Sequence, residues 1–90
     1  MNVEIEFSGS VKSVEALVRF LKHLEALVPR PVGTPKVGMR DGVIYVEAEF
    51  ATEDDDWKAG EKMAEVGADI VEDTDVLVVL APYTVKATGQ

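Results

Sequence analysis

The sequence predicts one α+β domain over residues 1–90, with strands and helices interleaved along the chain. Three observations predict this class. Apolar and polar residues alternate at the start of the chain, two segments repeat apolar residues at three- and four-residue steps, and an Asp-Gly pair stands between two strand-like segments. An apolar fraction of 47% in 90 residues is typical of a globular chain. At this length a second domain is not expected.

The first strand is predicted over Asn2–Phe7, because Val3, Ile5 and Phe7 alternate with polar residues. The first helix is predicted over Ser13–Val28, with Ser10 or Ser13 accepting hydrogen bonds from its free N–H groups. Its apolar stripe is predicted to consist of Val14, Leu17, Val18, Leu21, Leu24 and Val28, widened by Phe20 and Leu27. Prolines at 29, 31 and 35 predict an extended connection after this helix.

The clearest local signal is Asp41-Gly42, because this pair supplies the positive φ angles of a two-residue type I′ turn. It predicts a hairpin between Lys36–Arg40 and Val43–Phe50. A two-residue loop pairs Arg40 with Val43 and Met39 with Ile44. Continued outward, this register sets Lys36 opposite Glu47.

A second helix is predicted over Glu53–Val66, since Thr52 can cap it and acidic residues fill its first turn. Its expected inward residues are Trp57, Gly60, Met63, Ala64 and Gly67. Gly67 is expected to end the helix, which leaves residues 68–73 open between a further helical turn and a short strand.

The apolar run Val76–Ala81 predicts a strand that is apolar on both faces and ends at Pro82. Residues 83–88 could add an edge strand or form a tail, and a hairpin of Ala68–Val71 with Val76–Ala81 is a competing interpretation. The resulting order over residues 2–81 resembles the ferredoxin-like β-α-β-β-α-β sandwich. That resemblance implies an antiparallel sheet with both helices on one face.

Composition excludes several classes of function. The absence of cysteine removes disulfides, thiolate metal sites and cysteine nucleophiles. A net charge of −8 opposes binding to nucleic acid and to anionic lipid. No segment approaches the length of a membrane span, and the first residues lack the pattern of a signal peptide, so a cytoplasmic location is expected.

Few residues suggest catalysis, and no catalytic residue, metal ligand or cofactor is predicted. The loop Ser8–Ser13 could hold an anion at a helix start, but an ordinary strand-to-helix turn is the favoured interpretation. His23, the only histidine, is interpreted as a boundary residue of the first helix. An enzyme based on carboxylates or Lys12 is the least favoured class. One tyrosine, Tyr45, among glutamates makes a poor platform for stacking RNA bases.

Charge is divided unequally along the chain. Residues 1–46 hold six basic and five acidic side chains for +1, and residues 47–90 hold three basic and twelve acidic ones for −9. An asymmetry of this size indicates an electrostatic partner surface. A solvated, solubilising helix face is the alternative, and a cation site in Asp54–Asp56 lacks the required spacing. The predicted partner-binding residues are Glu53, Asp54, Asp55, Asp56, Glu61, Glu65 and Asp69.

These observations predict a small, acidic, non-enzymatic protein that docks on a basic surface of a larger protein. A natural target is a surface that normally holds DNA or RNA, as for an inhibitor of a nuclease or CRISPR-like machine encoded by a virus or mobile element. The alternative is a homo-oligomeric ligand-sensing or assembly domain that pairs through its sheet. In that case a homodimer is expected, with Val43, Tyr45 and Leu77 at its interface.

Overall fold

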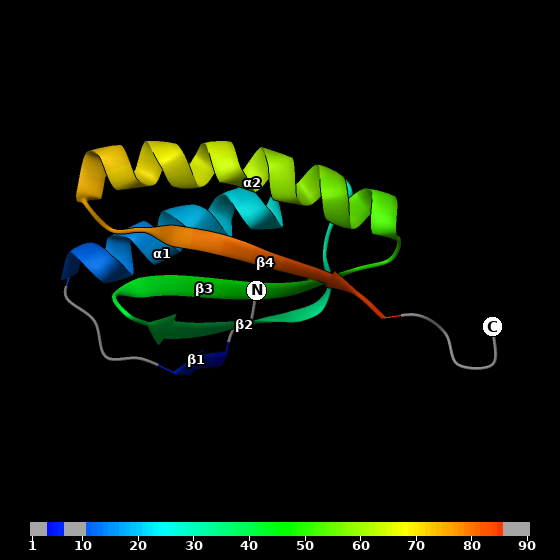
Figure 1. The fold of residues 1–90 in the computed structure, drawn as a ribbon, viewed down its shortest axis with the longest axis horizontal. Coiled ribbons are helices and arrows are strands. Elements are labelled where there is room, and N and C mark those ends of the chain that lie inside the picture. Colours follow the sequence, from blue (N-terminus) through cyan, green and yellow to red (C-terminus); the bar gives the residue numbers. More distant parts are fainter. Residues whose placement is uncertain (1–3, 7–10, 86–90) are drawn as a thin grey trace.

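The computed structural model describes residues 4–6 and 11–85, which form an α+β structure of one sheet and two helices (Figure 1). The elements are β1 (Glu4–Glu6), α1 (Val11–Glu25), β2 (Val32–Arg40), β3 (Val43–Phe50), α2 (Glu53–Thr74) and β4 (Val78–Thr84). The predicted α+β class is therefore observed. Part of the first predicted strand lies outside the described residues.

The sheet is mixed, in the order β1-β2-β3-β4. β2 and β3 pair antiparallel, whereas β1 pairs with β2 and β3 pairs with β4 in parallel. The prediction of an antiparallel sheet is thus wrong, and the ferredoxin-like order is not shown. In that order the first strand would lie between β3 and β4, but these two strands are hydrogen-bonded neighbours. The order of elements along the chain does not determine where each strand joins the sheet. The two strands of a β-α-β unit can be direct neighbours or can have another strand between them.

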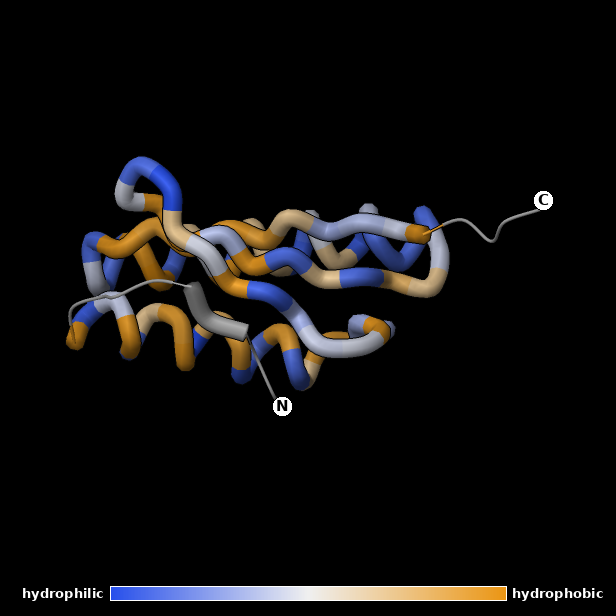
Figure 2. Tube along the Cα trace, turned by 90° about the horizontal axis from the view of Figure 1, so that it is seen from below, coloured by the Kyte–Doolittle hydropathy of each residue, from blue (hydrophilic) through white to orange (hydrophobic). Residues whose placement is uncertain are grey.

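The predicted hairpin register is confirmed. Arg40 pairs with Val43, Met39 with Ile44, and Lys36 with Glu47. Asp41 and Gly42 have φ angles of 53° and 79°, as a type I′ turn requires. Hydrophobic and hydrophilic residues alternate along both strands (Figure 2), and the hydrophobic set of β3 is buried. Turn chemistry and side-chain period therefore agree on one register.

Helix α1 begins two residues before and ends three residues before the prediction. Leu17, Phe20, Leu24 and Leu27 are buried as predicted, but the valines of the predicted stripe are exposed. Ser13 lies inside the helix and is buried, so it is not the cap, and Ser10 is outside the described residues. The buried residues are Ser13, Ala16, Leu17, Phe20 and Leu24. Val14 and Val18, predicted to be inward, are 51% and 43% exposed. The apolar stripe of α1 is wider than the part of the helix that contacts the core. The spacing of apolar residues alone therefore did not determine which of them are buried.

Helix α2 continues to Thr74, beyond the predicted end. Gly67 is inside the helix and buried, and Asp75 ends it in the left-handed conformation with φ 60°. The Asp75 N–H donates to the carbonyl of Val71 at 2.9 Å. The competing hairpin that begins at Ala68 is therefore wrong, and residues 68–73 are helical.

Strand β4 includes Pro82 instead of ending there, and Pro82 lies opposite Ala48 of β3. β4 is at the sheet edge, where a residue without an N–H is tolerated because its outer side needs no partner. Tyr83 and Thr84 continue β4 and do not begin the additional edge strand that was one alternative for residues 83–88. Residues 86–88 lie outside the described residues.

The core lies between the sheet and the two helices, which occupy the same side of it (Figure 1). Its largest fully buried side chains are Phe20, Phe50, Leu24, Ile44, Met63, Ile70, Val46, Val78 and Pro35. Arg19 of α1 and Asp73 of α2 form an ion pair of 3.0 Å across the outer surface of the helices. No helix within residues 11–85 is long and apolar enough to cross a membrane.

Candidate functional site

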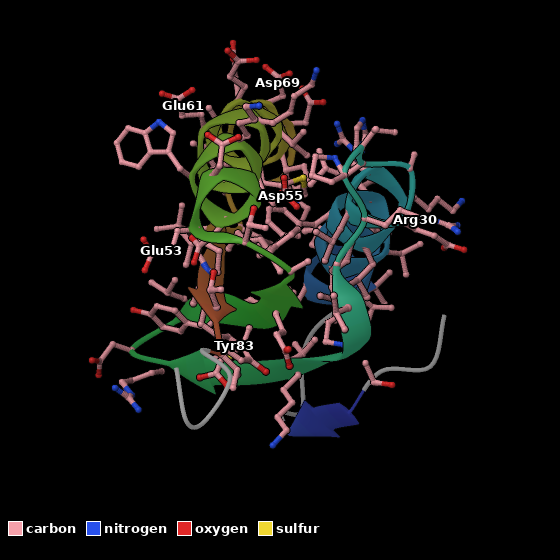
Figure 3. The ribbon with its side chains drawn as sticks, turned by 90° about the vertical axis from the view of Figure 1, so that its right-hand side faces the viewer. Arg30, Glu53, Asp55, Glu61, Asp69 and Tyr83 are labelled. Carbon is pink, nitrogen blue, oxygen red and sulfur yellow. The ribbon has the colours of Figure 1, made fainter. Side chains whose placement is uncertain are left out.

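The predicted site residues fall on two surfaces in different layers of the structure. The first is the outward side of α2, and the second is the side of the sheet that faces away from the helices. In Figure 3 the labelled Glu61 and Asp69 lie on α2 at one end of the molecule, and Tyr83 lies at the sheet on the opposite side. A partner of one surface therefore need not touch the other.

The first turn of α2 is held by its cap. Thr52 is extended, and its Oγ1 accepts a hydrogen bond of 3.1 Å from the N–H of Asp55. Four consecutive acidic residues follow Thr52, where the helix dipole favours negative charge. The predicted capping role of Thr52 is thus confirmed.

The structure separates two of the predicted partner-binding residues from the rest. Asp55 is half-buried, and in Figure 3 it lies on the side of α2 nearer to α1, away from Glu53 and Glu61. Asp56 is also half-buried, and its carboxylate oxygen lies 3.1 Å from the hydroxyl of Thr84. The Asp56 carboxylate therefore helps to hold the helix start against β4, and Asp55 lies off the exposed side of α2.

The remaining predicted residues share the outward side of α2 and are exposed. Glu72, which was not among the predicted residues, is exposed on the same side. We call this surface the acidic face, defined as Glu53, Asp54, Glu61, Glu65, Asp69 and Glu72. Glu61, Glu65 and Asp69 follow one another at four-residue steps, so neighbouring carboxylates stand on adjacent turns. Within residues 11–85, none of these three forms an ion pair.

Lys58 neutralises one end of the acidic face. Its Nζ lies 2.9 Å from the carboxylate of Asp54, one turn earlier. The hydrogen bond to Asp54 raises the pKa of Lys58 above its usual value, and the attraction of the Asp54 and Asp55 charges adds to this. Lys62 is exposed next to Glu61 and one turn before Glu65, so it offsets part of the charge at the centre of the face. With six carboxylates against these two lysines, the acidic face keeps an excess of negative charge.

Trp57 was predicted to point into the core, and that prediction is wrong. The residue is 66% exposed, and it stands one turn from both Glu53 and Glu61. The inward positions are Ala59, Met63, Gly67, Ile70 and Thr74, so Ala64 is outward as well. The helical series through Met63 and Ile70 sets Trp57 on the opposite side of α2, and the prediction missed this because it ended the helix before Ile70.

The open sheet face carries the residues predicted for an oligomer interface. Tyr45 and Leu77 are 37% and 41% exposed, and Val43 is half-buried. Tyr45 pairs with Val79 of β4, and the neighbouring Ile44 N–H donates to the Leu77 carbonyl at 3.0 Å. The fold therefore brings the three residues together at the hairpin-turn end of β3.

A hollow of about 470 Å³ lies on this face, over β2 and β3. Its floor is at Gly38, because a Cβ built there meets no atom within 4 Å. Its walls include Lys36, Arg40, Tyr45, Glu47 and Ala81. Tyr45 is the direct cross-strand neighbour of Gly38, yet its ring leaves the floor uncovered.

The other residues considered for chemistry are isolated. His23 is exposed, and its Nδ1 lies 2.9 Å from the carbonyl oxygen of Arg19. Lys12 is exposed in the first turn of α1. Within the described residues, no group of three or more His, Asp or Glu side chains is placed to hold a metal ion.

No protein-family model, curated protein or solved structure matches this chain.

Proposed function

We propose that this chain is a non-enzymatic interaction protein that docks through the acidic face of α2 on a basic surface of a cytoplasmic protein. The single observation that carries the proposal is the exposed Trp57 beside a line of carboxylates that has an excess of negative charge. Acidic residues alone are common on solvated helices. A tryptophan that is two-thirds exposed is uncommon, and tryptophan is among the residues that contribute most to binding at protein interfaces.

The line of carboxylates has a cost that supports a role beyond solubility. Like charges at four-residue steps destabilise a helix by about 0.2–0.5 kcal/mol per pair. Glu61 to Glu65 and Glu65 to Asp69 are two such pairs, and neither is relieved by an ion pair with a described residue. A partner that supplies lysine or arginine would remove this repulsion on binding.

Trp57 and its acidic neighbours suit an arginine-rich partner. A guanidinium can stack on an indole ring and at the same time pair with a carboxylate. Glu53 and Glu61, one turn to either side of Trp57, are in position for the second contact. The proposed partner therefore offers arginine side chains beside an apolar recess.

A surface that normally binds nucleic acid is the most natural target, since it is basic along its length. A rod of regularly spaced carboxylates resembles a phosphate backbone in charge. On this proposal the chain blocks access of DNA or RNA to its partner, as an inhibitor from a virus or mobile element would.

The test compares two double reversals with the same change in net charge. Glu61→Lys with Glu65→Lys alters the acidic face, and Glu15→Lys with Glu25→Lys alters exposed positions on α1. Proteins captured from the native host by the unmodified chain are purified, and their affinity for all three chains is measured at low and at high salt. Circular dichroism checks that each variant is folded.

We expect the α2 variant to lose binding and the α1 variant to keep it, with binding of the unmodified chain weakening as salt rises. Trp57→Ala should also weaken binding, mainly through faster dissociation. Equal binding by the two double variants would leave the acidic face as a solubilising surface.

A second candidate function is a homo-oligomeric ligand-sensing or assembly domain. The clustering of Val43, Tyr45 and Leu77 on the open sheet face favours it. The two functions use opposite layers of the structure, so a chain could carry both.

A further inference from the structure

We infer that two copies of this chain associate face to face through their open sheets, with Tyr45 of each copy seated in the hollow over Gly38 of the other. The inference rests on and deepens the second candidate function, the homo-oligomeric assembly domain, and it is independent of the acidic-face proposal, because the open sheet face is on the other side of the sheet from α2. Its occupant is a second copy, on three grounds: the hollow and the tyrosine that fills it lie at the same level along the strands, the charges of the face are self-complementary, and the face has an apolar border.

The first argument is one of shape. Gly38 and Tyr45 are directly paired across β2 and β3. In the proposed dimer a two-fold axis runs between the sheets of the two copies, parallel to the strands and above the line between β2 and β3. This rotation sets β2 of one copy over β3 of the other without shifting the level along the strands. Tyr45 of the second copy then stands over Gly38, where a Cβ would find open space.

The second argument is one of charge. The same rotation sets Lys36 over Glu47 of the second copy, because these residues share one level in the hairpin register. Both side chains are exposed, and neither forms an ion pair within residues 11–85. Arg40 lies two residues further along β2 from Gly38, where its guanidinium can reach the ring of the second copy's Tyr45. Each contact occurs twice, as a two-fold interface requires.

The third argument concerns the rest of the face. Val79 and Ala81 of β4 pair with Tyr45 and Glu47, and both are half-buried. Together with Leu77 they give the face an apolar border on the β4 side. A chain of this length leaves a large share of its apolar surface in water, so covering this border stabilises the folded state.

The net charge of −8 does not prevent the association. Most of it lies on α2, and in a face-to-face pair the two α2 helices are on the outside. Stacked sheets are about 10 Å apart, and each helix stands behind its own sheet, so the acidic faces are separated by more than the Debye length of about 8 Å. On β2 and β3, Lys36 and Arg40 balance Glu47 and Glu49.

The test uses light scattering and sedimentation over a range of protein concentrations. The unmodified chain is expected to show the mass of a dimer at high micromolar concentration and to dissociate on dilution. Gly38→Val should give a monomer at every concentration, since the new side chain fills the hollow. Its Cβ has open space, since no described atom lies within 4 Å, and circular dichroism checks that the variant is folded. Gly60→Ala, on the helix layer, should remain a dimer.

A charge swap separates contacts between copies from contacts within one copy. Lys36→Glu and Glu47→Lys should each be monomeric, because each places like charges opposite each other at the interface. An equal mixture of the two variants should form heterodimers, because the carboxylate introduced at position 36 of one chain then meets the ammonium introduced at position 47 of the other. No contact within a chain is changed by mixing.

A monomer at all concentrations of the unmodified chain would overturn the inference. So would a dimer that persists in Gly38→Val, since the copies would then meet through another face, such as the edge of β4. A mixture of the two charge variants that stays monomeric would overturn the proposed register. Glu61→Lys with Glu65→Lys should leave the dimer intact, so failure here is distinguishable from failure of the acidic-face proposal.

Discussion

A Cβ added to Gly67 would lie 2.7 Å from the carbonyl oxygen of Val78, so α2 approaches β4 at a distance that only glycine permits. This carbonyl oxygen belongs to the backbone of Val78, at the start of the parallel pairing of β3 with β4, so it has little freedom to move. This contact sets the separation of the helix layer from the sheet edge.

Gly67→Ala should therefore lower the free energy of unfolding by about 1–3 kcal/mol, the usual cost of overpacking. Gly60→Ala is the matched control. Its Cβ would lie 3.7 Å from Cγ of Pro82, an ordinary contact, so the better helix propensity of alanine should raise stability by about 0.5–1 kcal/mol. Urea denaturation of both variants measures the difference, and a Gly67→Ala variant as stable as the unmodified chain would contradict the close approach.

A second prediction concerns the hairpin turn. Gly42 has φ 79° and no atom within 4 Å of an added Cβ, so Gly42→Ala should act through backbone strain alone and cost about 1–2 kcal/mol. Gly38→Ala in the same hairpin has equal space and no positive φ, and should cost nothing. Thermal unfolding at low protein concentration compares them. Equal losses in the two variants would argue against a type I′ turn.

The cap of α2 gives a third prediction. Thr52→Ala removes the oxygen that accepts from the Asp55 N–H, and should lower stability by about 1 kcal/mol. Thr52→Ser keeps an acceptor and should retain most of the stability. Chemical denaturation of the pair is the measurement, and a serine variant as weak as the alanine variant would point to a packing role for the threonine methyl group.

The ion pair between the helices gives a fourth prediction. The side chains of Arg19 and Asp73 are 41% and 63% exposed, so their coupling should be only about 0.2–1 kcal/mol. A double-mutant cycle with Arg19→Ala and Asp73→Ala measures it. The coupling should shrink in about 1 M salt, where the Debye length is about 3 Å. A coupling that does not respond to salt would contradict an exposed pair.

The last prediction is a titration. The hydrogen bond and the charge of Asp54 raise the pKa of Lys58, so Asp54→Asn should bring that pKa back toward 10.5. A raised pKa means that the folded chain holds the proton more tightly than the unfolded chain. The stabilisation is therefore fully present below the unfolded pKa and is lost as pH rises through the folded one. NMR titration of the Lys58 side chain follows this, with Glu25→Gln as the control. An unchanged Lys58 pKa in Asp54→Asn would exclude the pair in solution.

Local chemistry in the sequence determined several features of this protein. The Asp41-Gly42 turn and the two-residue period of its flanking strands determined the hairpin register. Thr52 and the acidic turn after it determined where α2 begins. These signals act within a few residues, so no distant contact is needed to interpret them.

Tertiary packing decided the rest. Glycine is the residue type that most often follows the end of a helix, yet α2 continues through Gly67. The reason is tertiary: the Val78 backbone packs against Gly67 where a side chain would otherwise stand. The position of the sheet decides which apolar residues of each helix are buried. Trp57 of α2 and Val14 of α1 do not face the sheet, and both are exposed. The sequence likewise did not determine which strand each parallel strand pairs with. A connection through a helix fixes neither the register of the two strands nor the edge of the sheet at which the second strand joins. Only the folded sheet brings Val43, Tyr45 and Leu77 onto one surface, since that neighbourhood depends on β4 joining β3 across 22 residues of helix.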